Sequence, residues 1–359
     1  MLEIINKATR PVLIVGNGCR GTRIAKLASK LGWPVLVSWG FIDFKHKNVI
    51  DQFGVYGSRG ANYTVQNADL ILSIGCRLDT RMTGSNPKQF AREAKKIIVD
   101  IDKNELDKGV VIPDVKVNMD AGEFIDSMLK KKFKKNDYIK QCKQWQKEYP
   151  VQIPNGLTPY LFYKILGEES KCKIFTADTG ANMIILYQML KRRIITSLGH
   201  SPMGYALPAG IGIGLLGKEV IVITGDGGMQ MNIQELQTIK NYDVPIKVFV
   251  ISNQGYCLIR QFQDLYMGKR HVGTEEGVPD FAKVAKAYGI PSMTINFAGD
   301  IQEQIREALK MRQVIVNVIT DPCTTVLPRA IFGKPIEEQH PFLPDEEVVK
   351  NLIVKRWKS

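Results

Sequence analysis

The chain has 359 residues, of which 44% are apolar and 24% are charged. This composition is typical of a soluble globular protein and excludes collagen-like, disordered and disulfide-scaffold classes; the length predicts two domains. The formal charge of +13 raises the question of a nucleic-acid partner. Residues 130–147 hold eight lysines and one acid, so much of the excess lies in one segment, which a solvated helix face explains. No nucleic-acid-binding motif accompanies it, and we expect no such partner.

The cysteines and the apolar runs indicate the compartment. The six cysteines lie far apart without a C-x-x-C pair, a pattern that is neither a disulfide nor a zinc framework and that favours a reducing compartment. The first residues lack the apolar stretch of a secretory signal. The longest apolar run, 206–216, contains a proline and three glycines and is too short to span a bilayer. We therefore expect a cytoplasmic protein that has no membrane partner.

Short β-branched runs alternate with helix-length stretches along the chain. The runs predict buried parallel strands at 11–15, 34–38, 70–74, 96–101, 173–177, 220–224, 246–252 and 314–319. Helices are expected at 20–31, 233–241, 280–288, 301–311 and 345–354. This alternation predicts the α/β class, with two doubly wound parallel-sheet domains that carry helices on both faces.

The strand and helix alternation pauses once, and this pause sets the expected domain boundaries. It falls in the lysine-rich stretch that ends with Pro150 and Pro154. We expect a first domain at 1–128, a basic linker at 129–156, a second domain at 157–325 and a C-terminal tail at 326–359. The tail is rich in proline, and segments of this type usually wrap a neighbouring surface.

The strongest chemical signal follows the strand expected at 220–224. That strand runs into Gly225-Asp226-Gly227-Gly228, and the spacing of Asn232 and Glu235 is that of a helix capping box. A glycine-rich turn between a buried strand and a helix exposes backbone N–H groups that suit a phosphate. Asp226, at the end of the strand, would hold a divalent cation that bridges the phosphate, because Mg²⁺ prefers oxygen ligands.

Further oxygen ligands follow the next strand, expected at 246–252. Asn253 offers an amide oxygen there, and the tight turn after it exposes the carbonyl of Gly255. Ligands of open α/β sheets bind at this edge of the sheet, so the two segments together predict a Mg²⁺–diphosphate site. Either segment alone would be an ordinary turn.

The spacing of these segments resembles the signature of thiamine-diphosphate enzymes, GDG-x(24–27)-N-N. Here GDG is followed after 24 residues by Ser252 and Asn253, so that a serine stands where the first asparagine is usual. The stretch from His200 to Ala209 looks like the G-x-M-G-Y-x-L-P-A stretch of acetolactate synthase-like enzymes. The resemblance implies seven cofactor-binding residues, which are Asn182, Ser201, Met203, Gly225, Gly227, Gly228 and Tyr256. The thioether of Met203 would wedge between the cofactor rings, and the carbonyl of Ser201 would face the aminopyrimidine. Asn182 would lie in a diphosphate-contacting loop that lacks the usual histidine. Alternatively, the Met203 side chain packs in the hydrophobic core, which is a common role of methionine.

Residues 1–128 resemble the middle domain of the same superfamily, a six-stranded Rossmann-like unit. In acetolactate synthases the corresponding segments embrace FAD, and the resemblance implies FAD contacts at Gly16, Gly18, Gly57, Arg77, Asp79, Arg81 and Asp100. Many middle domains keep this fold but bind no nucleotide, or bind ADP. FAD is therefore a possible cofactor, and the G-x-G-x-x-G pattern at Gly16 is a weak signal by itself.

The resemblance implies a component of a thiamine-diphosphate- and Mg²⁺-dependent carboligase and decarboxylase. Its substrates would be a 2-keto acid, pyruvate by expectation, and a carbonyl acceptor. The family's activating glutamate belongs to a pyrimidine-binding domain that the resemblance does not cover, so we expect a separate chain or second subunit in a homo- or hetero-oligomer. His200 is the candidate substrate contact. Residues expected to select the acceptor are Gln254, Tyr256, Cys257 and Gln261.

Two alternatives stay open. One is a catalytically inactive cofactor-binding or regulatory subunit, or a truncated product. The other is a keto-sugar acceptor, because residues 333–344 look like tails of acetolactate synthase-like proteins associated with surface-polysaccharide biosynthesis.

Overall fold

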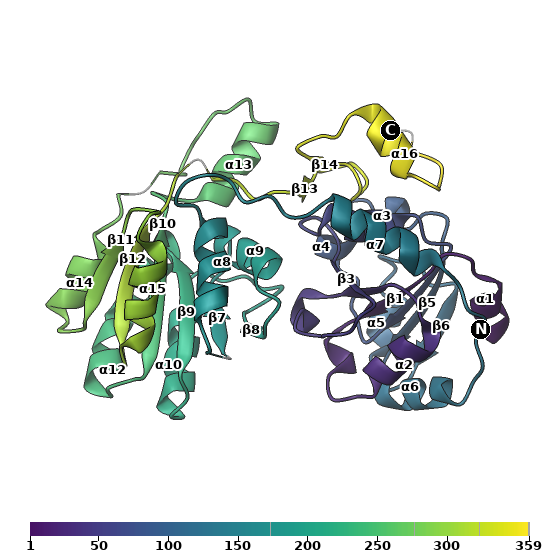
Figure 1. The fold of residues 1–359 in the computed structure, drawn as a ribbon, viewed down its shortest axis with the longest axis horizontal. Helices are drawn as coiled ribbons and strands as arrows, with labels where there is room; N and C mark the ends of the chain where they lie inside the picture. The colour runs from purple at the N-terminus through teal and green to yellow at the C-terminus, as the bar shows by residue number, and fades with distance from the viewer. Residues whose placement is uncertain (173, 276, 323, 358–359) are drawn as a thin grey trace. The chain divides into compact units, whose positions relative to one another are not determined.

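A computed structural model describes residues 1–172, 174–275, 277–322 and 324–357. The chain forms two compact units: unit 1 contains Met1–Val151 and Leu327–Ser359, and unit 2 contains Gln152–Val326 (Figure 1). Each unit is built on a six-stranded parallel sheet with flanking helices. The expectation of two α/β domains with doubly wound parallel sheets is confirmed.

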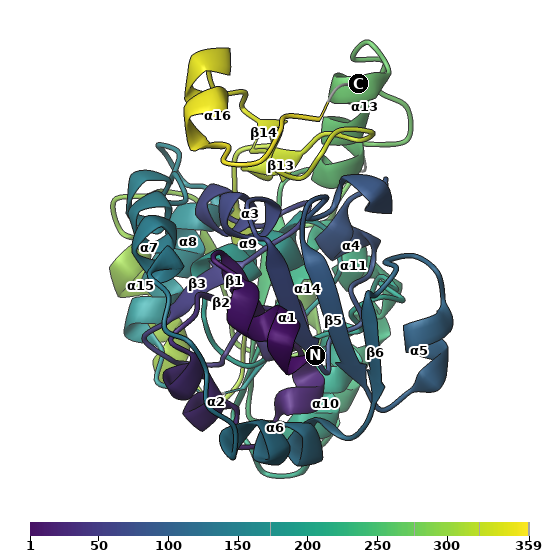
Figure 2. The ribbon, with the colours of Figure 1, turned by 90° about the vertical axis from the view of Figure 1, so that its right-hand side faces the viewer.

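The sheet of unit 1 has the strand order β3-β2-β1-β4-β5-β6. Its strands are β1 Pro11–Val15, β2 Val35–Val37, β3 Val49–Gln52, β4 Leu70–Ile74, β5 Lys95–Asp100 and β6 Val115–Asn118. All residues of β1 and β4 are buried, as their nearly continuous apolar sequences predict, and Ser73 of β4 is the one polar residue among them. Helix α2 (Ile24–Leu31) packs against α6 (Ala121–Leu129), and α3 (Arg59–Gln66) packs against α7 (Tyr138–Glu148). Figure 2 shows strands of this sheet between the two helix pairs.

The remaining helices of unit 1 are shorter. They are α1 Leu2–Lys7, α4 Thr80–Thr83, α5 Lys103–Asp107 and α16 Asp345–Asn351, together with short 3-10 turns at Asn17–Cys19, Trp39–Phe41 and Pro87–Gln89. Helix α2 begins at Ile24, later than the 20–31 expected, because a 3-10 turn follows β1 first.

The sheet of unit 2 has the strand order β11-β12-β10-β9-β7-β8. Its strands are β7 Phe175–Ala177, β8 Ile194–Ile195, β9 Val220–Gly225, β10 Ile246–Ser252, β11 Ser292–Ile295 and β12 Val314–Ile319. Its helices are α8 Pro159–Glu169, α9 Ala181–Met189, α10 Ala206–Leu215, α11 Asp226–Met231, α12 Leu236–Asn241, α13 Cys257–Tyr266, α14 Phe281–Ala287 and α15 Ile301–Lys310. A strand was expected from residue 173, which lies outside the described residues.

The segment expected as a basic linker contains a packed helix. Helix α7 buries Tyr138, Cys142 and Trp145, whose spacing of four and then three residues places them on one face. They pack in the core of unit 1 with Tyr63, and the Tyr138 hydroxyl donates to the Thr64 carbonyl at 2.9 Å. The lysines occupy the other faces of the helix. Their number made the segment look like a linker, although the apolar stripe predicts a helix. Residues up to Val151 thus belong to unit 1.

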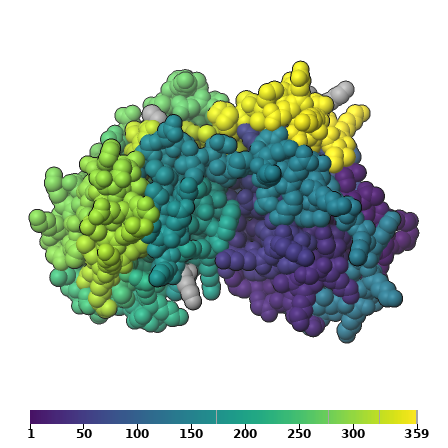
Figure 3. All heavy atoms as spheres, viewed as in Figure 1, coloured from purple at the N-terminus to yellow at the C-terminus, as the bar shows by residue number. Residues whose placement is uncertain are grey.

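The C-terminal tail returns to unit 1. The side chain of Asn62 donates to the Ile336 carbonyl at 2.7 Å, and Trp145 Nε1 donates to Asn351 Oδ1 at 2.7 Å. Within the tail, β13 (Arg329–Ala330) pairs with β14 (Gln339–His340) in an antiparallel ribbon. Figure 3 shows the tail (yellow) spread over the surface beside α7 (teal). The tail therefore completes the core of the domain that begins the chain.

Two findings bear on the compartment. The five described cysteines carry no disulfide and are all buried, while Cys323 lies outside the described residues. Across the described ranges, none of the helices combines the length and apolar character needed to cross a bilayer.

Candidate functional site

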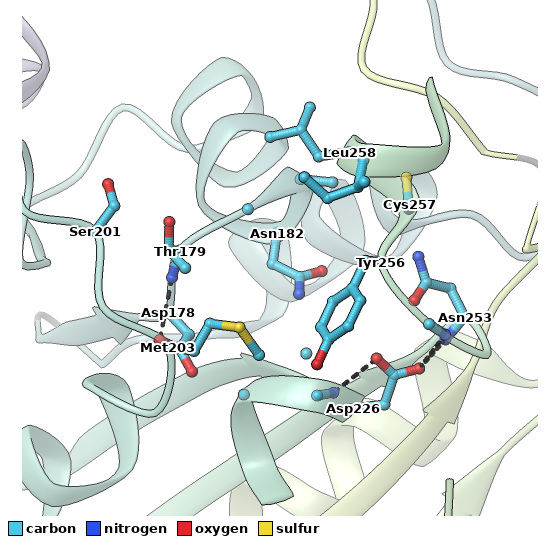
Figure 4. Close-up of a pocket in the computed structure, with 17 residues that line it drawn as sticks. Asp178, Thr179, Asn182, Ser201, Met203, Asp226, Asn253, Tyr256, Cys257 and Leu258 are labelled. Carbon is cyan, nitrogen blue, oxygen red and sulfur yellow. Dashed lines mark hydrogen bonds between the residues drawn. The ribbon is translucent and has the colours of Figure 1, made fainter. Parts of the chain in front are cut away.

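Three neighbouring strands of unit 2 end at one edge of the sheet, and each is followed by a polar side chain. Strand β9 pairs in parallel with β7 on one side and with β10 on the other. Asp178 follows β7, Asp226 follows Gly225 of β9, and Asn253 follows β10. A pocket of about 310 Å³ opens at this edge (Figure 4). Its lining is Asp178–Asn182, Ser201, Met203, Gly225–Gly228, Asn253 and Gly255–Ile259.

The glycine-rich segment passes directly into a helix. Helix α11 begins at Asp226 itself, so the helix follows the strand without an intervening loop. The expected capping box is wrong: Asn232 makes no side-chain cap on the 3-10 turn that follows it, and its amide donates to the Gly204 carbonyl at 2.7 Å. Glu235 instead accepts from the Thr238 hydroxyl at 2.8 Å.

Asp226 organises the turn that follows β10. Its Oδ1 accepts from the Gly227 N–H at 2.8 Å, and its Oδ2 accepts from Asn253 N–H at 3.0 Å and Gly255 N–H at 3.1 Å. The side chain is 2% exposed. Burial raises the pKa of Asp226, and the backbone N–H groups oppose that rise. A cation beside this carboxylate would favour its charged form.

The turn Asn253–Gly255 requires a glycine at its last position. Gly255 has φ +133°, and a Cβ there would lie 2.0 Å from the Thr274 carbonyl oxygen. The turn supplies an amide and a main-chain carbonyl beside the Asp226 carboxylate, and all three residues line the pocket. These are oxygen donors of the type that Mg²⁺ prefers. No group of three His, Cys, Asp or Glu side chains in the described part of the chain is arranged to hold a metal.

Met203 and Tyr256 meet above Gly227. A Cβ on Gly227 would lie 2.6 Å from Tyr256 Cε1 and 3.2 Å from Met203 Cε. On the other side of the glycine segment, a Cβ on Gly225 would lie 2.7 Å from the amide nitrogen of Asn182. The structure thus brings the predicted cofactor residues of unit 2 together, and glycine at 225 and 227 leaves room for the side chains of Asn182, Tyr256 and Met203 (Figure 4).

Ser201, expected to face the aminopyrimidine, and the residues expected to touch or select a substrate are placed differently from one another. Ser201 lines the pocket, and its hydroxyl donates to the Leu198 carbonyl at 2.8 Å. His200 is exposed and is not among the described residues of the lining. Cys257 lines the pocket, while the side-chain amide of Gln261 is held by the backbone of Val326, donating to its carbonyl at 3.0 Å. Gln254 is exposed, with φ +62°.

The serine that departs from the family signature has a partner on the neighbouring strand. The Ser252 hydroxyl donates to Asn317 Oδ1 at 2.5 Å, and both side chains are buried. Strands β10 and β12 are adjacent, so this bond joins them at the pocket edge of the sheet. The position therefore has a structural role in this chain.

Sequence reasoning missed Asp178. Its carboxylate is 1% exposed and accepts hydrogen bonds from the backbone N–H groups of Thr179, Gly204 and Tyr205 and from the hydroxyl of Thr224. Burial raises its pKa, against the effect of these donors. In the sequence, Asp178 is only a single acidic residue after a short strand. The sequence does not show which other segments lie beside its carboxylate in the fold.

The residues expected to contact FAD have partners within unit 1. The guanidinium of Arg77 pairs with Glu105 at 2.8 Å, Asp79 caps α4 by accepting from the N–H of Arg81 at 2.9 Å, and Asp100 accepts from the N–H of Asp102 at 3.0 Å.

Packing accounts for the glycines of this region and for Arg81. A Cβ on Gly16 would lie 2.0 Å from the Gly75 carbonyl oxygen, and one on Gly18 would lie 2.9 Å from Gly75 Cα. A Cβ on Gly57 would lie 2.5 Å from the Phe53 backbone. Arg81 lies over the Trp39 ring, 5.5 Å from its centroid. These contacts explain the residue types without a nucleotide.

Comparisons with known proteins match two family models to separate parts of the chain. The family model described as the central domain of thiamine pyrophosphate enzymes matches residues 1–128, and that of their C-terminal TPP-binding domain matches residues 178–318. The chain is 32% identical over 333 residues to the acetolactate synthase large subunit of Porphyra purpurea, an alignment that covers 86% of this chain and 56% of that protein.

Two further relatives carry related names. Identity is 30% over 398 residues to the probable acetolactate synthase large subunit of Methanococcus aeolicus, with 99% of this chain and 66% of that protein covered. It is 29% over 368 residues to the acetolactate synthase isozyme 3 large subunit of Escherichia coli K12, with 94% and 64% covered. The chain thus spans between 56% and 66% of the length of these relatives.

Proposed function

The chain belongs to the family of thiamine pyrophosphate enzymes, and we propose that it is the cofactor- and metal-binding component of an acetolactate synthase-like carboligase. The observation that carries this proposal is the meeting of Asp226, Asn253 and Gly255 beside the glycine segment in one pocket. The carboxylate, amide and carbonyl oxygens there suit Mg²⁺, and the backbone N–H groups at the start of helix α11 suit a diphosphate.

The residues of the pocket fit thiamine diphosphate in chemistry and in space. Asp226, Asn253 and Gly255 would hold Mg²⁺ and, through it, the diphosphate. Met203 and Tyr256 form an apolar wall above Gly227, against which the rings would pack. When bound, the cofactor supplies a nucleophilic carbon and an electron sink for the decarboxylation of a 2-keto acid. The residues of this chain orient the cofactor, hold the metal and shield the pocket from water.

The donor in this proposal is a 2-keto acid, pyruvate by analogy with the names of the relatives, and the acceptor is an aldehyde or ketone. Tyr256 lines the pocket and would face the acceptor, whereas the thiol of Cys257 donates to the Thr324 carbonyl at 2.9 Å. Gln261 has its amide committed to the Val326 backbone, so it would act on acceptor choice only through the position of α13. FAD stays a prediction from resemblance, and no step of the proposal depends on it.

Turnover also needs an acid that activates the cofactor. No glutamate is among the described residues that line the pocket, and Glu276 lies outside the described residues. We assign the activating glutamate to a pyrimidine-binding domain of the active oligomer, a domain that the family matches at residues 1–128 and 178–318 do not include. The isolated chain should therefore bind thiamine diphosphate and Mg²⁺ without forming acetolactate from pyruvate.

Titration calorimetry of the whole chain with thiamine diphosphate and Mg²⁺ tests this function. Asp226→Ala should weaken binding at least about tenfold, because it removes the only carboxylate among the proposed ligands. Asp264→Ala is the matched control, since it removes a surface carboxylate of unit 2 that pairs with His271. Equal affinities for the wild type and Asp226→Ala would overturn the site, and acetolactate formation by the chain alone would overturn the partner requirement.

A further inference from the structure

We propose that Asp178 is a positioning residue that ties the Met203 turn, residues 201–205, to the end of β9 and so fixes the wall of the pocket opposite Asp226. The proposal deepens the proposed function, because Met203 would be the residue that packs against the cofactor rings. Its structural part concerns only bonds within unit 2 and is testable without any cofactor.

Asp178 forms hydrogen bonds with segments that are distant from it in the sequence. Its own N–H donates to the Ile223 carbonyl at 2.9 Å, which fixes it beside β9. Oδ2 accepts from Gly204 N–H at 2.9 Å and from the Thr224 hydroxyl at 3.0 Å, while Oδ1 accepts from Tyr205 N–H at 3.2 Å and Thr179 N–H at 3.1 Å. One side chain thus joins the start of α9, the Met203 turn and the end of β9.

The four donors require an acceptor at both oxygens. An ionised carboxylate accepts at both, whereas an amide would place an NH₂ group against one pair of donors. Asp178→Asn therefore leaves Gly204 N–H or Tyr205 N–H without its acceptor in either orientation of the amide. Asp178→Ala removes both acceptors. Because these N–H groups lie in a buried or half-buried turn, each lost bond weakens the turn.

The bonds act on the pocket through the backbone of the Met203 turn. Gly204 follows Met203 directly and has φ +81°, so holding its N–H sets the path of the chain at Met203. The end of the Met203 side chain then reaches the space above Gly227. Figure 4 shows Asp178 and Met203 on one side of the pocket and Asp226 and Asn253 on the other. Two buried carboxylates thus hold separate walls of the same pocket.

This separation supplies an internal comparison. Asp226 holds the turn Asn253–Gly255 by two backbone N–H groups, whereas the side chain of Asp178 bonds to residues 179, 204, 205 and 224. Loss of Asp178 should loosen residues 201–205 and leave residues 253–255 protected. A general loss of stability in unit 2 would loosen both turns.

Amide hydrogen exchange of the whole chain, without thiamine diphosphate or metal, tests the positioning role. Asp178→Ala should speed exchange at residues 203–205 by about tenfold or more, because two backbone bonds are lost, while exchange at 253–255 stays within about twofold of the wild type. Thr176→Val is the matched control, since it removes a single buried bond from β7 to the Ala206 carbonyl without touching the carboxylate. Unchanged exchange at 203–205 in Asp178→Ala, or an equal rise at both turns, would overturn the proposal.

If Asp178→Ala does not fold, Asp178→Asn and Thr224→Val give the same test in milder form. Thr224→Val removes one donor to Oδ2 and should loosen residues 203–205 less than Asp178→Asn does. Equal exchange at 203–205 in the wild type and in both variants would contradict the positioning role.

Calorimetry separates this proposal from the proposed function. With saturating Mg²⁺, Asp178→Ala should bind thiamine diphosphate at least about tenfold more weakly than the Thr176→Val control. Asp178→Ala could show faster exchange at the Met203 turn and yet bind thiamine diphosphate as tightly as the control. That result would show that the order of the turn does not contribute to cofactor binding. Absence of binding in the wild type would overturn the proposed function, while the exchange result would still decide the role of Asp178.

Discussion

Gly228 leaves no room for a side chain beside Asp178. A Cβ built on Gly228 would lie 2.1 Å from Asp178 Oδ2 and 2.9 Å from Thr224 Oγ1. The last glycine of the GDGG segment is therefore required by the buried carboxylate of a neighbouring strand. A phosphate is not needed to explain it.

Gly228→Ala should destabilise unit 2 by about 3 kcal/mol, the upper part of the range for overpacking, because the carboxylate must move. In an Asp178→Ala background the same change should cost about 1 kcal/mol or less, since the nearest clashing atom is gone and only Thr224 Oγ1 stays close. Thermal unfolding of the two single variants and the double variant measures the coupling. Additive losses would show that Asp178 is not what excludes a side chain at 228.

Asp178 should also give unit 2 a specific dependence on pH. Its folded pKa is raised above the ordinary 3.8 by burial, so the protein binds this proton more tightly when folded. The contribution is fully present below the ordinary pKa and is lost as pH rises through the folded value. The wild type should therefore lose stability relative to Asp178→Asn as the pH rises above about 4. Unfolding by denaturant at several pH values checks this, and a difference between the two proteins that does not change with pH would contradict it.

The sequence predicted the central strands better than the edges. Strands at 11–15, 70–74, 246–252 and 314–319 are found with the expected bounds, because nearly continuous apolar runs mark strands buried on both faces. Strands β3 and β6 were missed because they lie at the edges of the sheet in unit 1, where β3 alternates between half-buried and buried residues and β6 between half-buried and exposed ones. The capping box failed for a different reason, since a short motif carries no information about where a helix actually begins.

The sequence predicted those site residues that belong to a local sequence motif. The glycine segment and the turn after β10 each have a pattern that is visible in the sequence, and the structure brings them to one pocket. Asp178 could not be found in this way, because its partners Gly204 and Thr224 lie 26 and 46 residues away. The apolar stripe of α7 was visible in principle at Tyr138, Cys142 and Trp145.

The tail of the chain should be essential to the stability of unit 1. Arg92 and Glu337 form an ion pair at 2.8 Å, with side chains that are 8% and 1% exposed, and Gln66 also donates to Glu337. Glu337→Gln leaves the Arg92 charge buried without its counterion, which typically costs about 3–5 kcal/mol.

Glu3→Gln is the control for this change, because its pair with Lys7 is exposed and should contribute about 0–1 kcal/mol. Guanidinium unfolding followed by tryptophan fluorescence measures both variants, because the four tryptophans of the chain all lie in unit 1. A loss in Glu337→Gln as small as that in Glu3→Gln would mean that the tail is only loosely attached to unit 1.

Met203 and His200 are three residues apart and should behave in opposite ways. Met203 lines the pocket and reaches the space above Gly227, whereas His200 is exposed. Met203→Ala should weaken thiamine diphosphate binding about tenfold or more, because the apolar contact of a whole side chain is worth about 1.5–3 kcal/mol. His200→Ala should leave the affinity within about twofold of the wild type, since less than about 0.5 kcal/mol is expected from an exposed residue. Calorimetry in saturating Mg²⁺ compares the two, and a larger loss in His200→Ala than in Met203→Ala would mean that the cofactor binds outside the pocket that Met203 lines.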